Sequence, residues 1–181
     1  MAEQTKIEYN DRMTTVGKIS WLWSNSDLHQ SWPYDLFTRF VLPPVMEQQI
    51  CIVESQGYPV AYCSWALLDK KTEQNYILNP NSLNPDQWNC GDRLWFCDWI
   101  SPFSPKFTWA LRSAMNDRFP EKVGRSMRVK KTQTQARIAV YAGQDLNKEQ
   151  SHSLRRRYFD ETAKGLRDNP DLDGNYKITV E

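Results

Sequence analysis

The segment Arg93-Leu94-Trp95-Phe96-Cys97-Asp98-Trp99-Ile100 constrains the fold more than any other part of this chain. In an extended strand, alternation places Leu94, Phe96, Asp98 and Ile100 on one face and Trp95, Cys97 and Trp99 on the other. A strand that is apolar on both faces has to be covered on both sides. We therefore predict a central strand over residues 92–100, ended by Ser101-Pro102.

The rest of the pattern supplies further strands and the covering helices. Residues 49–54 and 58–67 are rich in β-branched and aromatic residues, and Ser55-Gln56-Gly57 between them is typical of a hairpin turn. Helical spacing of apolar residues predicts helices over 14–23, 107–119 and 147–167, and another that begins at Ser31–Pro33 and stops at Pro43-Pro44. Short strands are predicted over 126–129 and 136–141. This order of elements predicts an α/β (α+β) fold, a mixed sandwich around one sheet.

Length and composition indicate a single globular domain. The chain has 181 residues, is 13% aromatic and contains only seven Gly. We expect a flexible N-terminal segment (1–12), a folded domain (13–170) and a C-terminal tail (171–181). The start of the chain lacks a secretory signal, and no segment approaches the roughly 20 apolar residues of a membrane span, which predicts a cytoplasmic protein.

Two polar residues stand in apolar surroundings. His29 lies between Trp21, Trp23 and Trp32, near a predicted helix end, and imidazole is the side chain best suited to proton transfer near neutral pH. Asp98 interrupts the apolar strand, where an unpartnered carboxylate is costly to bury.

Each of the two residues has a structural and a functional interpretation. Asp98 either joins a buried network with Arg93, another basic side chain or backbone donors, or accepts the Nδ1 hydrogen of a histidine. His29 either packs at a helix end or acts as a base. The other histidine, His152, lies beside Arg155 to Arg157 in a polar helix and is predicted to be solvated.

Several other kinds of site lack support. The four cysteines have neither CxxC spacing nor flanking histidines, so no metal site is expected. Cys63 and Cys97 fall within predicted strands, which favours core packing but leaves a nucleophilic thiol open. The sequence contains no GxGxxG, P-loop, HExxH or GxSxG motif.

A net charge of +1 conceals a basic block over residues 106–137, where nine Lys and Arg stand against Asp117 and Glu121. Such a block attracts an acidic partner, whether nucleic acid, anionic lipid or protein, or it is simply a solvated helix face. Because it lacks the basic and aromatic alternation of nucleic-acid-binding segments, we expect no nucleic-acid partner.

Four segments carry a resemblance to a known family. They are Ile19-Ser20-Trp21-Leu22-Trp23, Ser26-x-Leu28-His29-x-x-Trp32-Pro33, Tyr58-Pro59-Val60-Ala61-Tyr62-Cys63-Ser64-Trp65-Ala66 and Gly91-Asp92-Arg93-Leu94-Trp95-Phe96-Cys97-Asp98-Trp99-Ile100-Ser101-Pro102-Phe103. In this order, within a match from Val16 to Tyr141, the chain resembles the RTX toxin-activating lysine acyltransferases.

The resemblance implies a single-domain enzyme of GNAT-like fold, with a mostly antiparallel sheet flanked by helices. Such an enzyme transfers a fatty acyl group from acyl carrier protein, its thioester co-substrate, to internal lysines of an RTX protoxin, with no bound cofactor. The family's catalytic histidine falls on His29, its aspartate on Asp98, the serine of its motif on Ser26 and a supporting tyrosine on Tyr62. The chain departs from the family pattern at Asp27, where proline is usual, and at Gln30, where arginine is usual.

The chemistry of amide formation suits these residues. A lysine amine is protonated near neutral pH and must lose a proton to attack a thioester, which a histidine base oriented by a carboxylate can accept. Ser26 would steady the amine or the oxyanion. Two alternatives remain open, namely an acyl-enzyme relay through Cys63 or Cys97 and a noncatalytic binding protein that uses the basic block.

The basic block gains a use in this interpretation. Residues 125–135 contain no glycine, whereas enzymes that bind coenzyme A cradle its pyrophosphate with a Gly-rich loop, so a carrier-bound donor fits better. Acyl carrier proteins are small and acidic, and the block would dock one electrostatically. The candidate docking residues are Arg112, Arg118, Arg125, Arg128, Lys130 and Lys131. The oligomeric state stays open, and a homodimer is compatible with the sequence.

Overall fold

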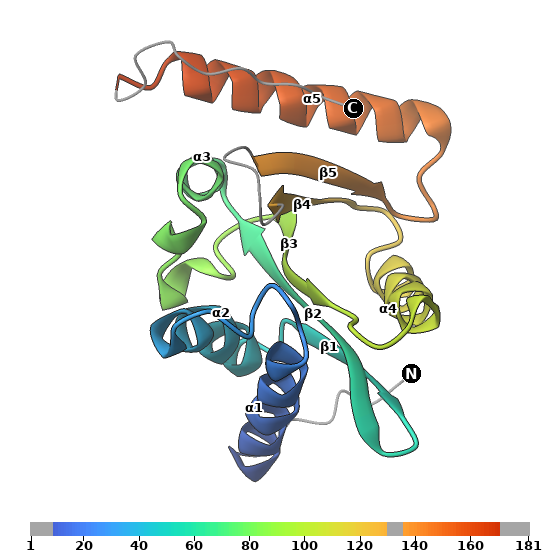
Figure 1. Cartoon of the computed structure of the whole chain (residues 1–181). Coiled ribbons are helices and arrows are strands. Elements are labelled where there is room, and N and C mark those ends of the chain that lie inside the picture. The colour runs from blue at the N-terminus through green and yellow to red at the C-terminus, as the bar shows by residue number, and fades with distance from the viewer. Residues whose placement is uncertain (1–8, 130–135, 171–181) are drawn as a thin grey trace.

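The computed structural model describes residues 9–129 and 136–170 of the chain (Figure 1). Its helices are α1 (Tyr9–Ser24), α2 (Tyr34–Met46), α3 (Lys70–Leu78), α4 (Pro105–Arg118) and α5 (Lys148–Arg167), with short 3-10 turns η1 (Pro80–Ser82) and η2 (Pro85–Gln87). Its strands are β1 (Ile50–Ser55), β2 (Tyr58–Leu68), β3 (Arg93–Ile100), β4 (Val123–Val129) and β5 (Ala136–Ala142). The predicted tail 171–181, residues 1–8 of the predicted N-terminal segment, Lys130 and Lys131 lie outside the described residues, and residues 9–12 belong to α1.

The described strands form one sheet in the order β1-β2-β3-β4-β5. Every neighbouring pair is antiparallel except β3 and β4, which are parallel and in register at Trp95 and Arg125. The predicted α/β class and the central position of residues 93–100 are therefore confirmed. The arrangement agrees with the GNAT-like fold that the resemblance implied.

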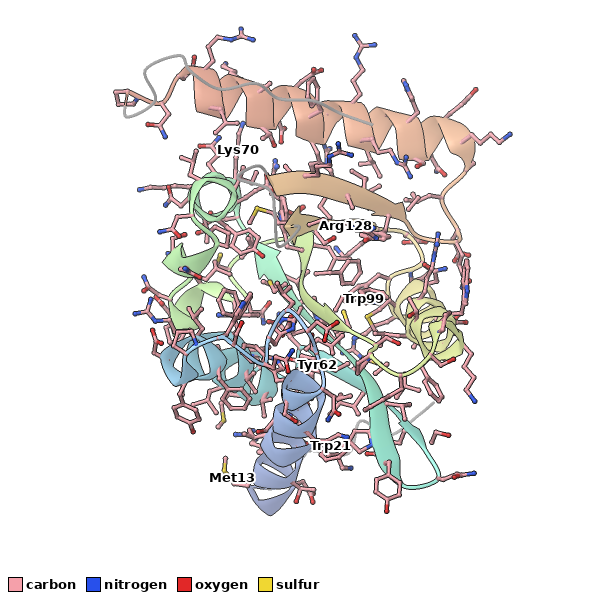
Figure 2. All side chains as sticks on the ribbon, in the orientation of Figure 1. Met13, Trp21, Tyr62, Lys70, Trp99 and Arg128 are labelled. Carbon is pink, nitrogen blue, oxygen red and sulfur yellow. The ribbon has the colours of Figure 1, made fainter. Side chains whose placement is uncertain are left out.

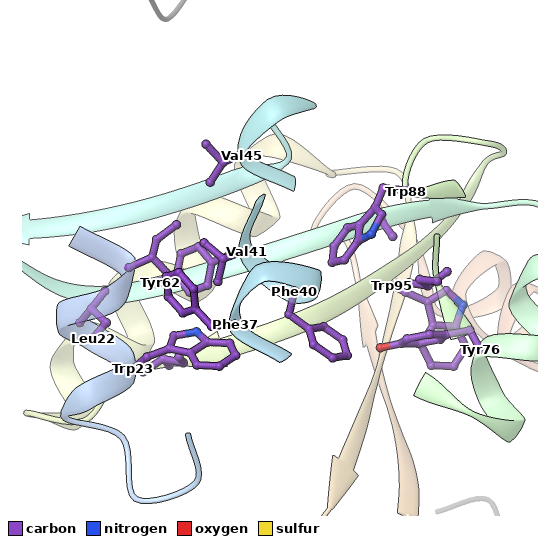
Figure 3. Close-up of a cluster of buried hydrophobic side chains, with 14 of the residues drawn as sticks. Leu22, Trp23, Phe37, Phe40, Val41, Val45, Tyr62, Tyr76, Trp88 and Trp95 are labelled. Carbon is purple, nitrogen blue, oxygen red and sulfur yellow. The ribbon is translucent and has the colours of Figure 1, made fainter. Parts of the chain in front are cut away.

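Helices cover both faces of the sheet, as the apolar β3 requires. Figure 1 shows α1, α2 and α3 on one side and α4 on the other, with α5 lying along β5. The larger apolar cluster lies on the α1–α2 face, where Trp23, Phe40 and Val41 pack on Tyr62 and Trp95 (Figure 3). The smaller cluster joins Leu111 and Met115 of α4 to the opposite face. Burial of these aromatic and aliphatic side chains is the main stabilising term of the fold.

The hairpin between β1 and β2 has the predicted turn. Ser55 pairs with Tyr58, and the two residues between them both have positive φ, 52° at Gln56 and 81° at Gly57. Two consecutive positive values are the signature of a type I′ turn, whose twist matches that of the flanking strands.

Two helix predictions need correction. The helix α2 does not stop at Pro43-Pro44 but continues to Met46, because the carbonyls of these prolines still accept hydrogen bonds from the N–H groups of Glu47 and Gln49. Helix α3 was not predicted at all. Its N-cap is Asp69, whose carboxylate accepts a 2.7 Å bond from the backbone N–H of Thr72.

A β-bulge in β3 overturns the predicted alternation. Ser64 of β2 pairs with Asp98, but the next residue, Trp65, pairs with Phe96, so Cys97 has no partner of its own. Leu94 and Phe96 therefore pack on the α4 face together with Trp99, whereas Asp98 and Ile100 turn to the α1–α2 face. A bulge inserts one extra residue and re-aims the side chains beyond it. In this chain it directs Asp98 toward the segment that carries His29.

Candidate active site

The turn between α1 and α2 holds His29. The N–H groups of His29 and Gln30 both bond the carbonyl of Ser26, at 3.0 and 2.9 Å, and the His29 carbonyl accepts from Trp32. This turn directs the imidazole into the protein, where His29 is only 5% exposed. His29 thus lies between two helices, as the sequence predicted.

The structure brings His29 and Asp98 into direct contact, although 69 positions separate them in the chain. Nε2 of His29 lies 2.8 Å from Oδ1 of Asp98, and both side chains are almost fully buried. Ser26 Oγ lies 2.7 Å from the other ring nitrogen, Nδ1. In its functional interpretation Asp98 accepts the Nδ1 hydrogen, and that detail is wrong: the carboxylate bonds Nε2 and the serine bonds Nδ1.

This geometry specifies one consistent hydrogen-bonding chain. When Asp98 is ionised and His29 is neutral, the carboxylate only accepts, so Nε2 carries the hydrogen and Nδ1 presents its lone pair. The Ser26 hydroxyl then donates to Nδ1. Because His29 and Asp98 are 5% and 6% exposed whereas Ser26 is only half-buried, the serine hydroxyl is the end of this chain that a substrate can reach.

Two indole rings wall the imidazole. The ring centroids of Trp23 and Trp32 both lie 4.7 Å from that of His29, tilted by 46° and 55°. Trp21, the third tryptophan of the sequence cluster, is instead half exposed on α1 (Figure 2). Apolar walls exclude water and strengthen the electrostatic coupling between a base and its carboxylate. The arrangement can take up a proton through Ser26 and stabilise the resulting imidazolium.

Comparison with known proteins identifies the family. A model of the RTX toxin acyltransferase family matches residues 8–142, well over half of the chain. The chain belongs to the RTX toxin acyltransferase family. It is an acyltransferase, as the four sequence segments predicted.

Three curated relatives illustrate the range of this similarity. The protein-lysine palmitoyltransferase CyaC of Bordetella bronchiseptica is 44% identical over 157 residues, which cover 87% of this chain and 85% of CyaC. The RTX-III toxin-activating lysine-acyltransferase ApxIIC of Actinobacillus pleuropneumoniae is 38% identical over 86% of this chain and 89% of its own. The protein-lysine myristoyltransferase HlyC of Escherichia coli is 34% identical over 96% and 99%.

Tyr62 of this acyltransferase lies on the same face of the sheet as Asp98, and its hydroxyl bonds neither His29 nor Asp98, the two residues of the candidate catalytic dyad. The side chain is fully buried in the cluster of the α1–α2 face, and its hydroxyl forms no hydrogen bond with the described residues. Burial, followed by the charge of Asp98, raises the pKa of Tyr62 well above its usual value. The tyrosine ring is therefore part of the apolar cluster, and its hydroxyl keeps its proton.

The described docking candidates divide into two groups. Arg112, Arg118 and Arg128 are exposed, and their guanidinium groups lie over aromatic rings or bond a tyrosine hydroxyl, as Arg128 does to Tyr141 at 2.8 Å. Arg125 does not belong with them. It is 3% exposed and its guanidinium bonds Glu73, so its prediction as a docking residue is wrong. Arg125 lies in β4 between two buried residues, although its charge predicted a position at the surface.

Arg93, the other partner considered for Asp98, is paired elsewhere. Its guanidinium bonds Glu73 and Glu161 and not Asp98. Sequence reasoning missed this second buried cluster, since Glu73 and Glu161 lie on exposed-looking polar helices. The only signal was the need of buried Arg93 for a counter-charge.

The thiols and the remaining surface offer no rival centre among the described residues. Burial raises the pKa of Cys63 well above its usual value and that of Cys97 to about 12. In residues 9–129 and 136–170 no three His, Cys, Asp or Glu side chains gather to hold a metal ion.

Two cavities, one between α4 and β3–β5 and one between α3 and α5, are not lined by Ser26, His29 or Asp98. No described helix is long and apolar enough to cross a membrane.

Proposed function

We propose that this acyltransferase, in the cytoplasm, moves a fatty acyl chain from acyl carrier protein to the ε-amino groups of internal lysines of an RTX protoxin and thereby activates it. The names of the relatives support lysine as the acceptor and a fatty acyl chain as the group transferred. The observation that carries the proposal is the hydrogen-bonded chain Ser26–His29–Asp98, which connects a buried base to a half-buried hydroxyl.

His29 is the general base of the proposed reaction. The neutral lysine amine attacks the thioester carbonyl, and the proton of the attacking nitrogen passes to Ser26 Oγ while the serine proton passes to Nδ1 of His29. Asp98 stabilises the imidazolium through Nε2. When the C–S bond breaks, the departing pantetheine thiolate takes the proton from His29, so that an amide and a thiol result and the enzyme returns to its starting state.

The exposed arginines support a carrier-bound donor. Arg112 and Arg118 of α4 and Arg128 of β4 present positive charge to solvent, which suits an acidic carrier protein. Lys130 and Lys131 complete the proposed docking set, and Arg125 is excluded from it by its burial. The absence of glycine from residues 125–135 fits a donor whose phosphopantetheine is presented by a protein.

The cysteine relay is the weaker alternative. It needs a thiolate near neutral pH, and the raised pKa values of Cys63 and Cys97 keep both thiols protonated. Neither thiol bonds His29, whose two ring nitrogens are taken by Ser26 and Asp98. A purely noncatalytic role for the basic block is disfavoured by membership of an acyltransferase family.

The test combines the purified chain, acyl carrier protein loaded with a fatty acid, and a protoxin fragment, with the intact mass of the fragment as readout. We expect acylation by the wild type and none by His29→Ala, whereas the control His152→Ala keeps full activity. Asp98→Asn should slow transfer by about 10²- to 10⁴-fold, and Asp92→Asn, an exposed control, should not. Full turnover by His29→Ala would refute the proposed mechanism. An acyl adduct on the enzyme that disappears in Cys63→Ser or Cys97→Ser would favour the relay.

A further inference from the structure

We propose that Trp23 is a positioning residue for the catalytic carboxylate, whose indole N–H holds Asp98 in the orientation that His29 requires. This inference rests on the proposed function, because it assigns a second role to a residue next to the same dyad. Trp23 acts through Asp98 and touches no substrate in this proposal.

Asp98 is bonded at both of its carboxylate oxygens. Nε1 of Trp23 donates to Oδ2 at 3.0 Å, while Oδ1 faces Nε2 of His29 at 2.8 Å. The two carboxylate oxygens thus have different partners on two different segments. A carboxylate held at both oxygens cannot rotate about its Cβ–Cγ bond without losing a charge-assisted bond in a site from which water is excluded.

Trp23, the hydrogen-bond donor, is held rigidly by its packing. Trp23 is 5% exposed and packs edge-on against Phe37 (Figure 3) and against Trp32, with interplanar angles of 85° to both. The indole N–H is the only polar group of the side chain, and a buried indole normally finds one acceptor. Here that acceptor is Asp98, so core packing of α1 fixes the direction of the bond.

Asp98 directly follows Cys97, the residue without a partner in the bulge of β3. A bulge leaves the ladder locally disrupted, so the strand alone orients this side chain less firmly than a regular position would. Neighbouring polar groups on the same face do not compensate. The hydroxyls of Tyr62 and Ser64 are buried without hydrogen-bond partners in the described structure. The Trp23 bond therefore supplies the restraint that the backbone lacks.

The chain contains a matched control. Trp32 also packs against the imidazole of His29, at the same centroid distance of 4.7 Å, but Asp98 takes its indole bond from Trp23. Any effect of an altered ring next to the imidazole should appear at both positions. An effect of the lost N–H on the carboxylate should appear only at Trp23.

The experiment replaces Trp23 by benzothienylalanine, which keeps the bicyclic ring and lacks the N–H, and makes the same replacement at Trp32. We expect kcat to fall at least tenfold for the Trp23 variant, with KM for acyl carrier protein and for the protoxin fragment unchanged within about twofold. The Trp32 variant alters a ring beside the imidazole but keeps the bond to Asp98, so its kcat should stay about fivefold or more above that of the Trp23 variant. In an Asp98→Ala background the Trp23 replacement should cause no further loss, because no acceptor is left for the indole N–H.

The outcomes separate this inference from the proposed function. Equal kcat values for the Trp23 and Trp32 variants, or a full additional loss in the Asp98→Ala background, would overturn the positioning role while leaving lysine acylation by the wild type intact. A wild-type enzyme that transfers no acyl group would instead refute the proposed function. Thermal unfolding of Trp23→Phe, measured together with kcat, distinguishes a loss of packing from a loss of positioning. A loss of packing lowers Tm whether or not Asp98 is present.

Discussion

The guanidinium of Arg125 lies 4.6 Å from the ring centroid of Trp95, the residue opposite it at the parallel junction of β3 and β4. Both side chains bond the same carboxylate, Glu73 of α3, which Trp95 reaches through Nε1 at 2.8 Å. Arg93 bonds the other oxygen of Glu73 at 2.6 Å and also bonds Glu161 of α5. One buried cluster of alternating charges therefore joins α3, α5 and the two parallel strands.

Glu73→Gln should destabilise the fold strongly. The substitution leaves two buried guanidinium groups with only Glu161 as counter-charge, and breaking a buried ion pair on one side typically costs about 3–5 kcal/mol. Urea unfolding followed by circular dichroism measures the loss. The exposed Glu121→Gln should change the free energy of unfolding by less than about 0.5 kcal/mol. Equal midpoints for the two variants would contradict the importance of the cluster.

Asp69→Ala should lower stability in a pH-dependent way. The backbone N–H of Thr72 holds the pKa of Asp69 below its usual value, and loss of such an N-cap typically costs about 1 kcal/mol. A depressed folded-state pKa contributes stability above the unfolded value of about 3.9, and this contribution disappears as the pH falls through the folded value. The difference between wild type and Asp69→Ala should thus be full at pH 7 and shrink below about pH 4. Asp86→Ala, at an exposed position, serves as the control.

Tyr62→Phe should be tolerated. The hydroxyl is buried and has no hydrogen-bond partner among the described residues, so its removal leaves stability unchanged or raises it by about 1 kcal/mol. Transfer should stay within about twofold of the wild type, because no proton step passes through this group. Tyr62→Ala, which removes the ring, should instead cost about 3–5 kcal/mol. A large loss of kcat in Tyr62→Phe with an unchanged Tm would show that the hydroxyl takes part in the reaction.

Cys97 should resist alkylation in the folded enzyme. Burial raises its pKa to about 12, so the thiolate, which is the reactive form, stays scarce across pH 7–9 and increases only as the pH approaches that value. Iodoacetamide labelling followed by peptide mass spectrometry should leave Cys97 unmodified, while the urea-unfolded chain is labelled fully. Cys97→Ala should retain acyl transfer. Rapid labelling of native Cys97 at pH 7 would contradict this prediction and favour the acyl-enzyme mechanism through Cys97.

Much of the architecture could be predicted from local pattern. The apolar segment 93–100 required a covered central strand, and Ser55-Gln56-Gly57 required a tight hairpin. Helix α3 escaped prediction because its sequence is polar and its stability comes from the Asp69 cap and from the contacts of buried Glu73, which lie on other elements. Pro43-Pro44 predicted an end of α2 that is too early, because the carbonyls of these prolines still accept hydrogen bonds from a final helical turn.

The sequence by itself determined the residue types of the site, the family to which they belong and the strand that had to be central. Only the tertiary structure decided which face of that strand Asp98 occupies and which nitrogen of His29 it meets. Period-two alternation cannot reveal a bulge, because the extra residue depends on pairing with β2 rather than on the identity of Cys97. The hydrogen bond from Trp23 to Asp98 was hidden for the same reason, since a bond between positions 75 residues apart exists only once α1 packs on the sheet.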